Sequence, residues 1–224
     1  IGVMEFYVQK IAKAGTFNGE AIKLDEKIYL GAEDTHAGFL IAPSKNNEKL
    51  LIAHVCPQLV CHKNEESKNE KNTTLFYKVY DKDLQRKWDA EIEMPYLFKG
   101  FFIDKMTIDN NDKVYILATN YTNLTLTKLP NGFNFVMHVY DNSTKKYINN
   151  DIDINKLFIT DLGFAVNENN NIVTIAGFYS SDKSFNVVGS VYGELDLEKN
   201  LMGKKGFSPF SLLFTEHIAL EQPE

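Results

Sequence analysis

Cysteine, proline and tryptophan are scarce in this chain of 224 residues, which contains two, six and one of them respectively. Two cysteines are too few for a small fold held together by disulfides. The longest apolar runs, such as residues 114–118, are far shorter than the ~18 to 20 residues of a membrane span. Basic residues cluster no further than pairs, and 30 Asp and Glu against 24 Lys and Arg give a formal net charge of −6. We therefore expect neither a membrane span nor nucleic-acid binding.

Aromatic residues and asparagine are abundant instead. Aromatics make up 12% of the chain, mostly as 16 Phe and 11 Tyr, and the 22 asparagines amount to one residue in ten. Aromatic residues favour strands, and asparagine favours tight turns. This composition predicts an all-β protein whose strands are joined by short turns.

A hairpin-like unit recurs along the chain. Its first half is an apolar strand, a turn rich in Asn and Asp, and a second apolar strand, at residues 38–53, 105–117 and 163–176. Its second half is another strand pair, at residues 75–92, 134–148 and 188–204. Corresponding positions lie about 60 residues apart, and four short strands per unit are typical of a β-propeller blade.

The repeat predicts a β-propeller-like array of four-stranded antiparallel units within one domain, residues 1–224. An immunoglobulin-like sandwich, the structural alternative, would need ~100 residues for its seven strands. The predicted units span residues 36–98, 99–157 and 158–207, with partial units at 1–35 and 208–224. Residues 210–214 begin either another unit or a short C-terminal helix. Because such an array is incomplete, we expect remaining repeats or another subunit to cover its open ends.

One part of the third unit resembles a known group of sequences. The segments are Gly177–Ser181, Val188–Asp196 and Lys205–Phe207. They are similar to uncharacterised propeller-like β-repeat proteins of Bacteroidetes, which often carry a Gly-Phe-Tyr-Ser segment before a strand that contains glycine. The resemblance implies a repeat fold and brings no catalytic residues with it.

The densest group of potential metal ligands is His54, Cys56, Cys61 and His62. If residues 50–56 form a strand, His54 and Cys56 share one face, and a short loop could return the other two residues toward them. The spacing fits no standard zinc pattern. A disulfide between Cys56 and Cys61 in an oxidising compartment, or two reduced cysteines, are the alternatives.

Several carboxylates fall in predicted turns, and Asp81, Asp109 and Asp141 are the candidates for a binding or catalytic face. Turn carboxylates of this kind can bind Ca²⁺, but none has the spacing of a calcium-binding loop, so the predicted cofactor is Ca²⁺ or none. Trp88 lies in a Trp-Asp dipeptide like that of some propeller blades and is a further candidate for the binding loops. The charged segment 63–74 and the segment 121–132 would form the rim of such a surface.

Catalytic motifs are missing: the chain contains neither a nucleophile elbow nor a glycine-rich phosphate loop. We therefore expect a non-enzymatic binding or scaffold module that recognises a protein or a glycan. The alternative is a hydrolase or lyase that acts on glycans with carboxylates or a metal. The expected location is outside the cytoplasm, in the periplasm, at the cell surface or secreted.

Overall fold

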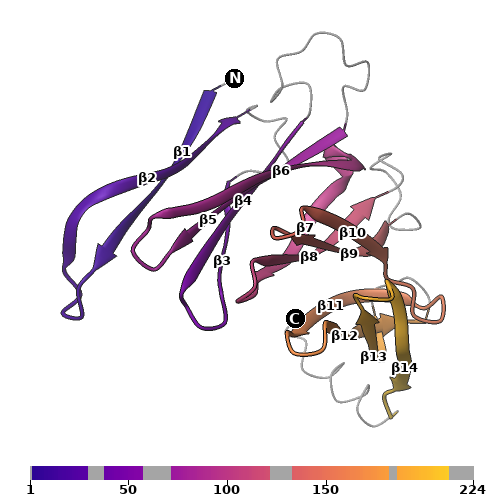
Figure 1. The fold of residues 1–224 in the computed structure, drawn as a ribbon. Helices are drawn as coiled ribbons and strands as arrows, with labels where there is room; N and C mark the ends of the chain where they lie inside the picture. The colour runs from indigo at the N-terminus through magenta and orange to yellow at the C-terminus, as the bar shows by residue number, and fades with distance from the viewer. Residues whose placement is uncertain (1, 30–37, 58–71, 122–132, 182–185, 212–224) are drawn as a thin grey trace, which may run out of the picture. The chain divides into compact units, whose positions relative to one another are not determined.

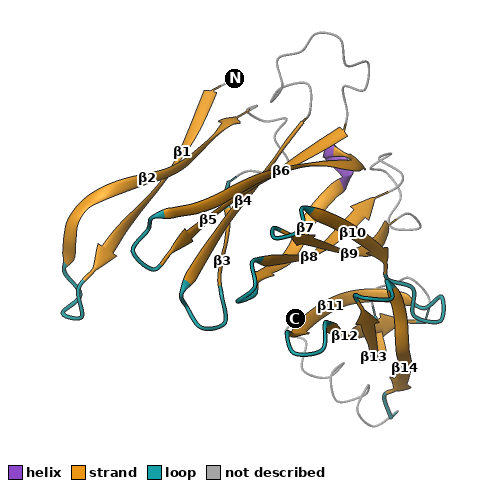
Figure 2. Cartoon of the chain, viewed as in Figure 1, coloured by secondary structure: helices purple, strands orange, loops and turns teal. Residues whose placement is uncertain are grey.

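The computed structural model describes residues 2–29, 38–57, 72–121, 133–181 and 186–211. Most of these residues belong to β-strands, as Figures 1 and 2 show. The elements are β1 (Gly2–Ile11), β2 (Phe17–Tyr29), β3 (Leu40–Pro43), β4 (Lys49–Pro57), β5 (Asn72–Asp81), β6 (Arg86–Leu97), the short 3₁₀ helix η2 (Phe98–Gly100), β7 (Phe101–Ile108), β8 (Lys113–Tyr121), β9 (Phe133–Asp141), β10 (Lys146–Asp151), β11 (Phe158–Asn167), β12 (Ile172–Ser180), β13 (Val187–Asp196) and β14 (Leu201–Pro209).

The strands form three four-stranded antiparallel sheets and one two-stranded sheet. Strands β3 to β6, β7 to β10 and β11 to β14 each make one sheet in which neighbours in sequence are neighbours in space, and β1 pairs with β2. These simple up-and-down sheets, one after another along the chain, confirm the predicted all-β fold of four-stranded propeller-like units.

The chain divides into two compact units, which are described separately: unit 1 is Ile1–Phe102 and unit 2 is Ile103–Glu224. Unit 1 holds the β1–β2 hairpin and the sheet β3–β6. Unit 2 holds the sheets β7–β10 and β11–β14, apart from the first two residues of β7. The predicted partial unit at residues 208–224, including any terminal helix, lies almost entirely outside the described residues, as do most of the segments 63–74 and 121–132.

Six hairpin turns of the four-stranded sheets, all within the described residues, repeat one backbone device. A single residue adopts the left-handed conformation at φ values between 52° and 64°, and in three of the six turns that residue is asparagine. The six residues are Asn47, Leu84, Asp112, Lys145, Asn171 and Asn200. Asparagine tolerates this conformation better than most residues, which explains why the turns are rich in it.

Each unit buries its own apolar residues. In unit 1, Leu24 of the hairpin packs with Ile52 and Tyr80 of the neighbouring sheet. Unit 2 has a core between its two sheets, where Leu117, Met137 and Ile154 are among the most deeply buried side chains. Within the part of the chain that the structure describes, no helix has the length and apolar character needed to cross a membrane.

Candidate functional site

Two of the four predicted metal ligands, His54 and Cys56, lie among the described residues. His54 and Cys56 both lie on β4 and are buried, and Cys56 is disulfide-bonded. A disulfide sulfur is not the thiolate that binds zinc. Cys61, the other cysteine of the sequence, and His62 lie outside the described residues. Among the residues that the structure describes, no group of three or more His, Cys, Asp and Glu side chains could hold a metal ion.

His54 instead faces a carboxylate that the sequence analysis did not single out. Its Nδ1 lies 3.3 Å from Oδ2 of Asp25 on β2, and the two side chains are 7% and 1% exposed. The other carboxylate oxygen, Oδ1, accepts hydrogen bonds from the ammonium group of Lys78 and from the backbone N–H of Glu26. We call Asp25, His54 and Lys78 the charged cluster of unit 1.

Aromatic rings surround this cluster. The imidazole of His54 stacks on Phe76 with ring centres 4.9 Å apart and meets the edge of Phe39 at 5.3 Å. Burial by itself raises the pKa of Asp25, but the contacts with His54 and Lys78 outweigh it and hold the pKa below its ordinary value. Asp25 is therefore ionised at neutral pH and joins the hairpin to the sheet β3–β6.

The three candidate carboxylates shape turns. Oδ1 of Asp81 accepts hydrogen bonds from the backbone N–H groups of Asp83 and Gln85, each at 2.9 Å. Oδ1 of Asp109 likewise accepts hydrogen bonds from the backbone N–H groups of Asn111 and Lys113, each at 2.8 Å. The second oxygen of Asp109 accepts a hydrogen bond from the hydroxyl of Tyr115 at 2.9 Å.

Asp141 acts in the same way in the turn between β9 and β10. Burial raises its pKa, but hydrogen bonds from Ser143 and Thr144 outweigh that effect and lower it. Asp109 and Asp141 belong to turns of one sheet, whereas Asp81 belongs to unit 1. The carboxylates therefore bond to their own turns. Trp88, a candidate for the binding loops, is half-buried on β6, the fourth strand of its sheet.

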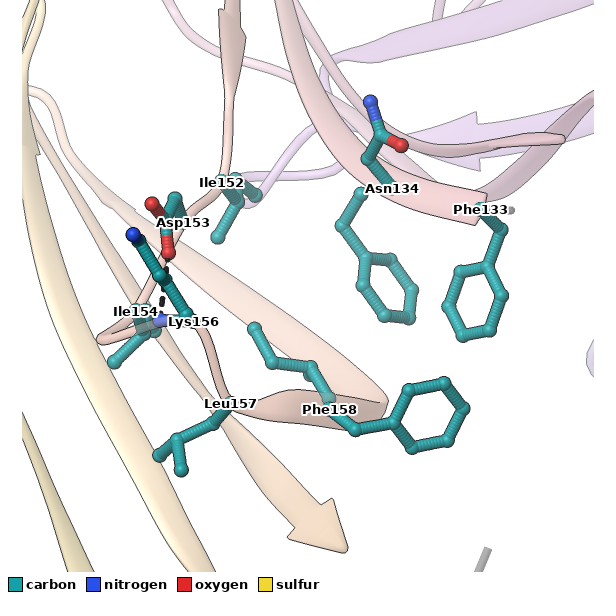
Figure 3. Close-up of a pocket in the computed structure, with 10 residues that line it drawn as sticks. Phe133, Asn134, Ile152, Asp153, Ile154, Lys156, Leu157 and Phe158 are labelled. Carbon is teal, nitrogen blue, oxygen red and sulfur yellow. Dashed lines mark hydrogen bonds between the residues drawn. The ribbon is translucent and has the colours of Figure 1, made fainter. Parts of the chain in front are cut away.

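Unit 2 contains a pocket that the sequence analysis did not predict. It has a volume of about 280 Å³ and lies between β9, β11 and the segment that joins β10 to β11. Figure 3 shows Phe133 and Phe158 on one side and Ile154 and Leu157 on the other. The lining residues are Phe133, Asn134, Phe135, Ile152, Asp153, Ile154, Lys156, Leu157, Phe158 and Ile159.

The floor of the pocket is rigid and apolar. Phe135, Ile152, Ile154 and Ile159 are buried, and they belong to the core between the two sheets of unit 2. The ring of Phe133 meets those of Phe135 and Phe158 edge to face, with centres 5.6 and 5.5 Å apart. Such contacts fix the orientation of the rings before any ligand arrives.

Polar groups lie at the mouth of the pocket. Asn134, Asp153 and Lys156 line it and are exposed. Oδ1 of Asp153 accepts the backbone N–H of Lys156 at 2.9 Å, and the backbone N–H of Ile152 bonds to the carbonyl of Phe135 at 2.8 Å. The pocket thus combines an apolar interior with a polar edge, as small-molecule sites commonly do.

A sequence signal for this pocket exists but is weak. Phe133 and Phe135 are separated by Asn134 in β9, and Phe158 follows a run in which Ile152 and Ile154 alternate with Asp153. Alternation of this kind places the apolar side chains on one face. It does not reveal that the two segments line one cavity, because their pairing depends on the packing of two different sheets.

No family model matches the chain, and a search of the curated proteins also finds no match. Three solved structures share part of its fold. They are cobalt-substituted Synechocystis ACO, at a TM-score of 0.49 and 12% identity, a chimera of ACO and RPE65, at 0.47 and 12%, and a mutant of Synechocystis apocarotenoid oxygenase, at 0.47 and 11%. The matches cover 76% or 77% of this chain but 38% of each solved chain.

These matches correct the predicted function. We expected a non-enzymatic binding or scaffold module, or a hydrolase or lyase acting on glycans, whereas a solved structure with this partial likeness is named an oxygenase, which is an enzyme of another class. At these values the likeness assigns no activity to the present chain.

Proposed function

We propose that the protein acts on a small apolar molecule and that the pocket of unit 2 holds part of it. The pocket itself is the observation that supports this proposal. Seven of its ten lining residues are Phe, Ile or Leu, and its floor is buried apolar core. A concave apolar site with a few polar groups at its edge is the usual form of a substrate or ligand site.

The size of the pocket limits the ligand. Its volume of about 280 Å³ lies just below the roughly 300 to 1,000 Å³ that is typical of small-molecule sites. A molecule with one ring or a short hydrocarbon chain fits that space. Binding such a group would remove from water the apolar surface that Phe133, Leu157 and Phe158 still expose, since these residues are half-buried without a ligand.

A neutral one-ring molecule, toluene, tests the proposal. We expect calorimetric titration to show saturable binding, and we expect Phe158→Ala to weaken binding by about tenfold, the equivalent of 1.4 kcal/mol. Phe178→Ala is the matched control, because Phe178 is 43% exposed in the same unit and does not line the pocket. Equal binding by the protein and by Phe158→Ala would contradict the proposal.

Two further predictions concern the metal content and the location of the protein. Ca²⁺ or no cofactor is the expected metal content, and calorimetric titration with Ca²⁺ measures it. A location outside the cytoplasm is supported by the disulfide at Cys56, since disulfides persist mainly in oxidising compartments.

A further inference from the structure

The mouth of the pocket carries more positive than negative charge. Asp153 supplies one carboxylate and Lys156 one ammonium group, and both residues line the pocket. A second ammonium group, that of Lys205, donates a hydrogen bond to the backbone carbonyl of Asp153 at 3.1 Å. The formal sum of these three side chains is +1, although the chain as a whole is acidic.

The ammonium group of Lys156 is available to a ligand. Among the described residues it makes neither a hydrogen bond nor an ion pair, and only the backbone N–H of Lys156 bonds to Asp153. Lys145 offers a useful contrast, because its ammonium group donates a hydrogen bond to the side-chain oxygen of Asn142 at 2.6 Å.

The backbone that presents Lys156 is unusual. Asn155 and Lys156 are consecutive residues in the left-handed conformation, at φ values of 55° and 56°. Asparagine adopts this conformation readily, but lysine does so at a cost, and strained residues are often found at ligand sites. Asp153 holds the turn through its bond to the backbone of Lys156, which sets where the lysine side chain leaves the chain.

We infer that the molecule bound in this pocket carries a carboxylate, or a comparable anionic group, next to its apolar body. This inference rests on the proposed function of the pocket. The apolar body lies against Phe133, Phe158 and Leu157, and the anionic group faces the ammonium of Lys156 at the mouth. Lys156 thereby selects acids over neutral molecules of the same shape, and Lys205 adds to the positive potential there.

A pair of probes that differ only in charge tests this selection. We would titrate the protein with 4-phenylbutanoate and with its neutral amide, 4-phenylbutanamide, and measure both affinities by calorimetry or by chemical-shift changes. Because the ion pair would be solvent-exposed, we expect the acid to bind about threefold to fivefold more tightly than the amide.

Two variants assign the selection to one residue. Lys156→Met keeps the length of the side chain and removes its charge, so it should abolish the preference for the acid and leave the affinity for the amide unchanged. Lys145→Met is the matched control, because Lys145 has the same left-handed backbone in the same unit and does not line the pocket. It should keep the preference.

The possible outcomes separate the inference from the proposed function. Equal binding of acid and amide to the unsubstituted protein, or a preference that survives in Lys156→Met, would overturn the role of Lys156 while the apolar pocket stands. Failure of both probes and of toluene to bind would refute the pocket as a ligand site, and with it this inference.

Discussion

The charged cluster of unit 1 and the pocket of unit 2 differ in how far other side chains already contact their charged and apolar groups. In the cluster, the carboxylate of Asp25 has Lys78 at one oxygen and His54 beside the other, and aromatic rings enclose the group. In the pocket, three apolar side chains remain half-buried, and the ammonium group of Lys156 has no partner among the described residues.

This difference separates a structural site from a candidate functional one. A buried ion group whose charges already balance gains little from a further ligand, and removing one member leaves the others uncompensated. When a ligand covers a preformed apolar pocket, apolar surface is removed from water, and the free energy of the system falls. The buried cluster of unit 1 is therefore a structural group that is costly to break, whereas uncovered apolar surface indicates binding in unit 2.

The largest effect should follow from loss of the carboxylate in the cluster. Asp25→Ala leaves the ammonium group of Lys78 without its counter-charge and removes the carboxylate beside His54, and we expect unit 1 to lose about 3 kcal/mol of stability. This is the lower end of the usual range, because the Lys78 side chain is 26% exposed and can reach water. Urea unfolding followed by the fluorescence of Trp88, the single tryptophan, reports on unit 1.

Asp83→Ala is the control for this variant. Asp83 is exposed, and its carboxylate lies 3.9 Å from the ammonium of Lys10, so its removal should cost less than ~0.5 kcal/mol. A loss of similar size in both variants would mean that the cluster does not join the hairpin to the sheet.

The two units should also differ in their response to acid. Burial lowers the pKa of His138 in unit 2 to about 3, so the folded state holds this ring neutral while the unfolded chain takes up a proton near pH 6.5. Stability of unit 2 is therefore lost as the pH falls below about 6.5, by about 2 kcal/mol between pH 7 and pH 5. Hydrogen exchange of peptides from β8 and β9 measures this loss.

Because of Asp25, the stability of unit 1 should depend on pH over a different range. Its pKa is lowered in the folded state, so its contribution is present above about pH 4 and is lost as the pH falls through the folded value. Peptides from β2 and β4 should keep their protection at pH 5. In unit 2, His138→Gln should remove most of the loss between pH 7 and pH 5, and an unchanged loss would assign it to other groups.

Removal of a neutral hydrogen-bond donor to a buried carboxylate should have an intermediate effect on stability. Tyr115→Phe removes the hydroxyl that donates to Asp109 Oδ2, and burial together with that carboxylate raises the pKa of Tyr115. We expect unit 2 to lose about 1.5 kcal/mol, since hydrogen bonds to charged groups are the stronger ones. Tyr192→Phe, at a residue that is 54% exposed, should change little. Thermal unfolding followed by tyrosine circular dichroism compares the two variants.

The fold could be predicted from sequence because its signals are local and repeated. Asn47, Asn171 and Asn200 each occupy the left-handed turn position that makes asparagine frequent here, and β13, which precedes the turn at Asn200, buries alternate residues. The site could not be predicted, because it depends on contacts between distant residues. Asp25 lies 29 residues from His54 and 53 from Lys78 in sequence, and only the packing of the hairpin on the sheet brings them together.

The smallest expected effect on stability is that of Lys156→Gly. This variant is the most informative one, because its stability and its binding preference should change in opposite directions. Lys156→Gly removes a side chain from a left-handed position, where glycine has no steric penalty, and we expect unit 2 to gain about 0.5 kcal/mol. The same variant should lose the preference for 4-phenylbutanoate over its amide. Lys145→Gly should show a similar gain and keep that preference, since its lysine does not line the pocket. Thermal unfolding and calorimetry on both variants measure the two quantities. A loss of stability in Lys156→Gly would show that the lysine supports the turn, whereas a gain in stability with the preference intact would place the anionic group of the ligand elsewhere.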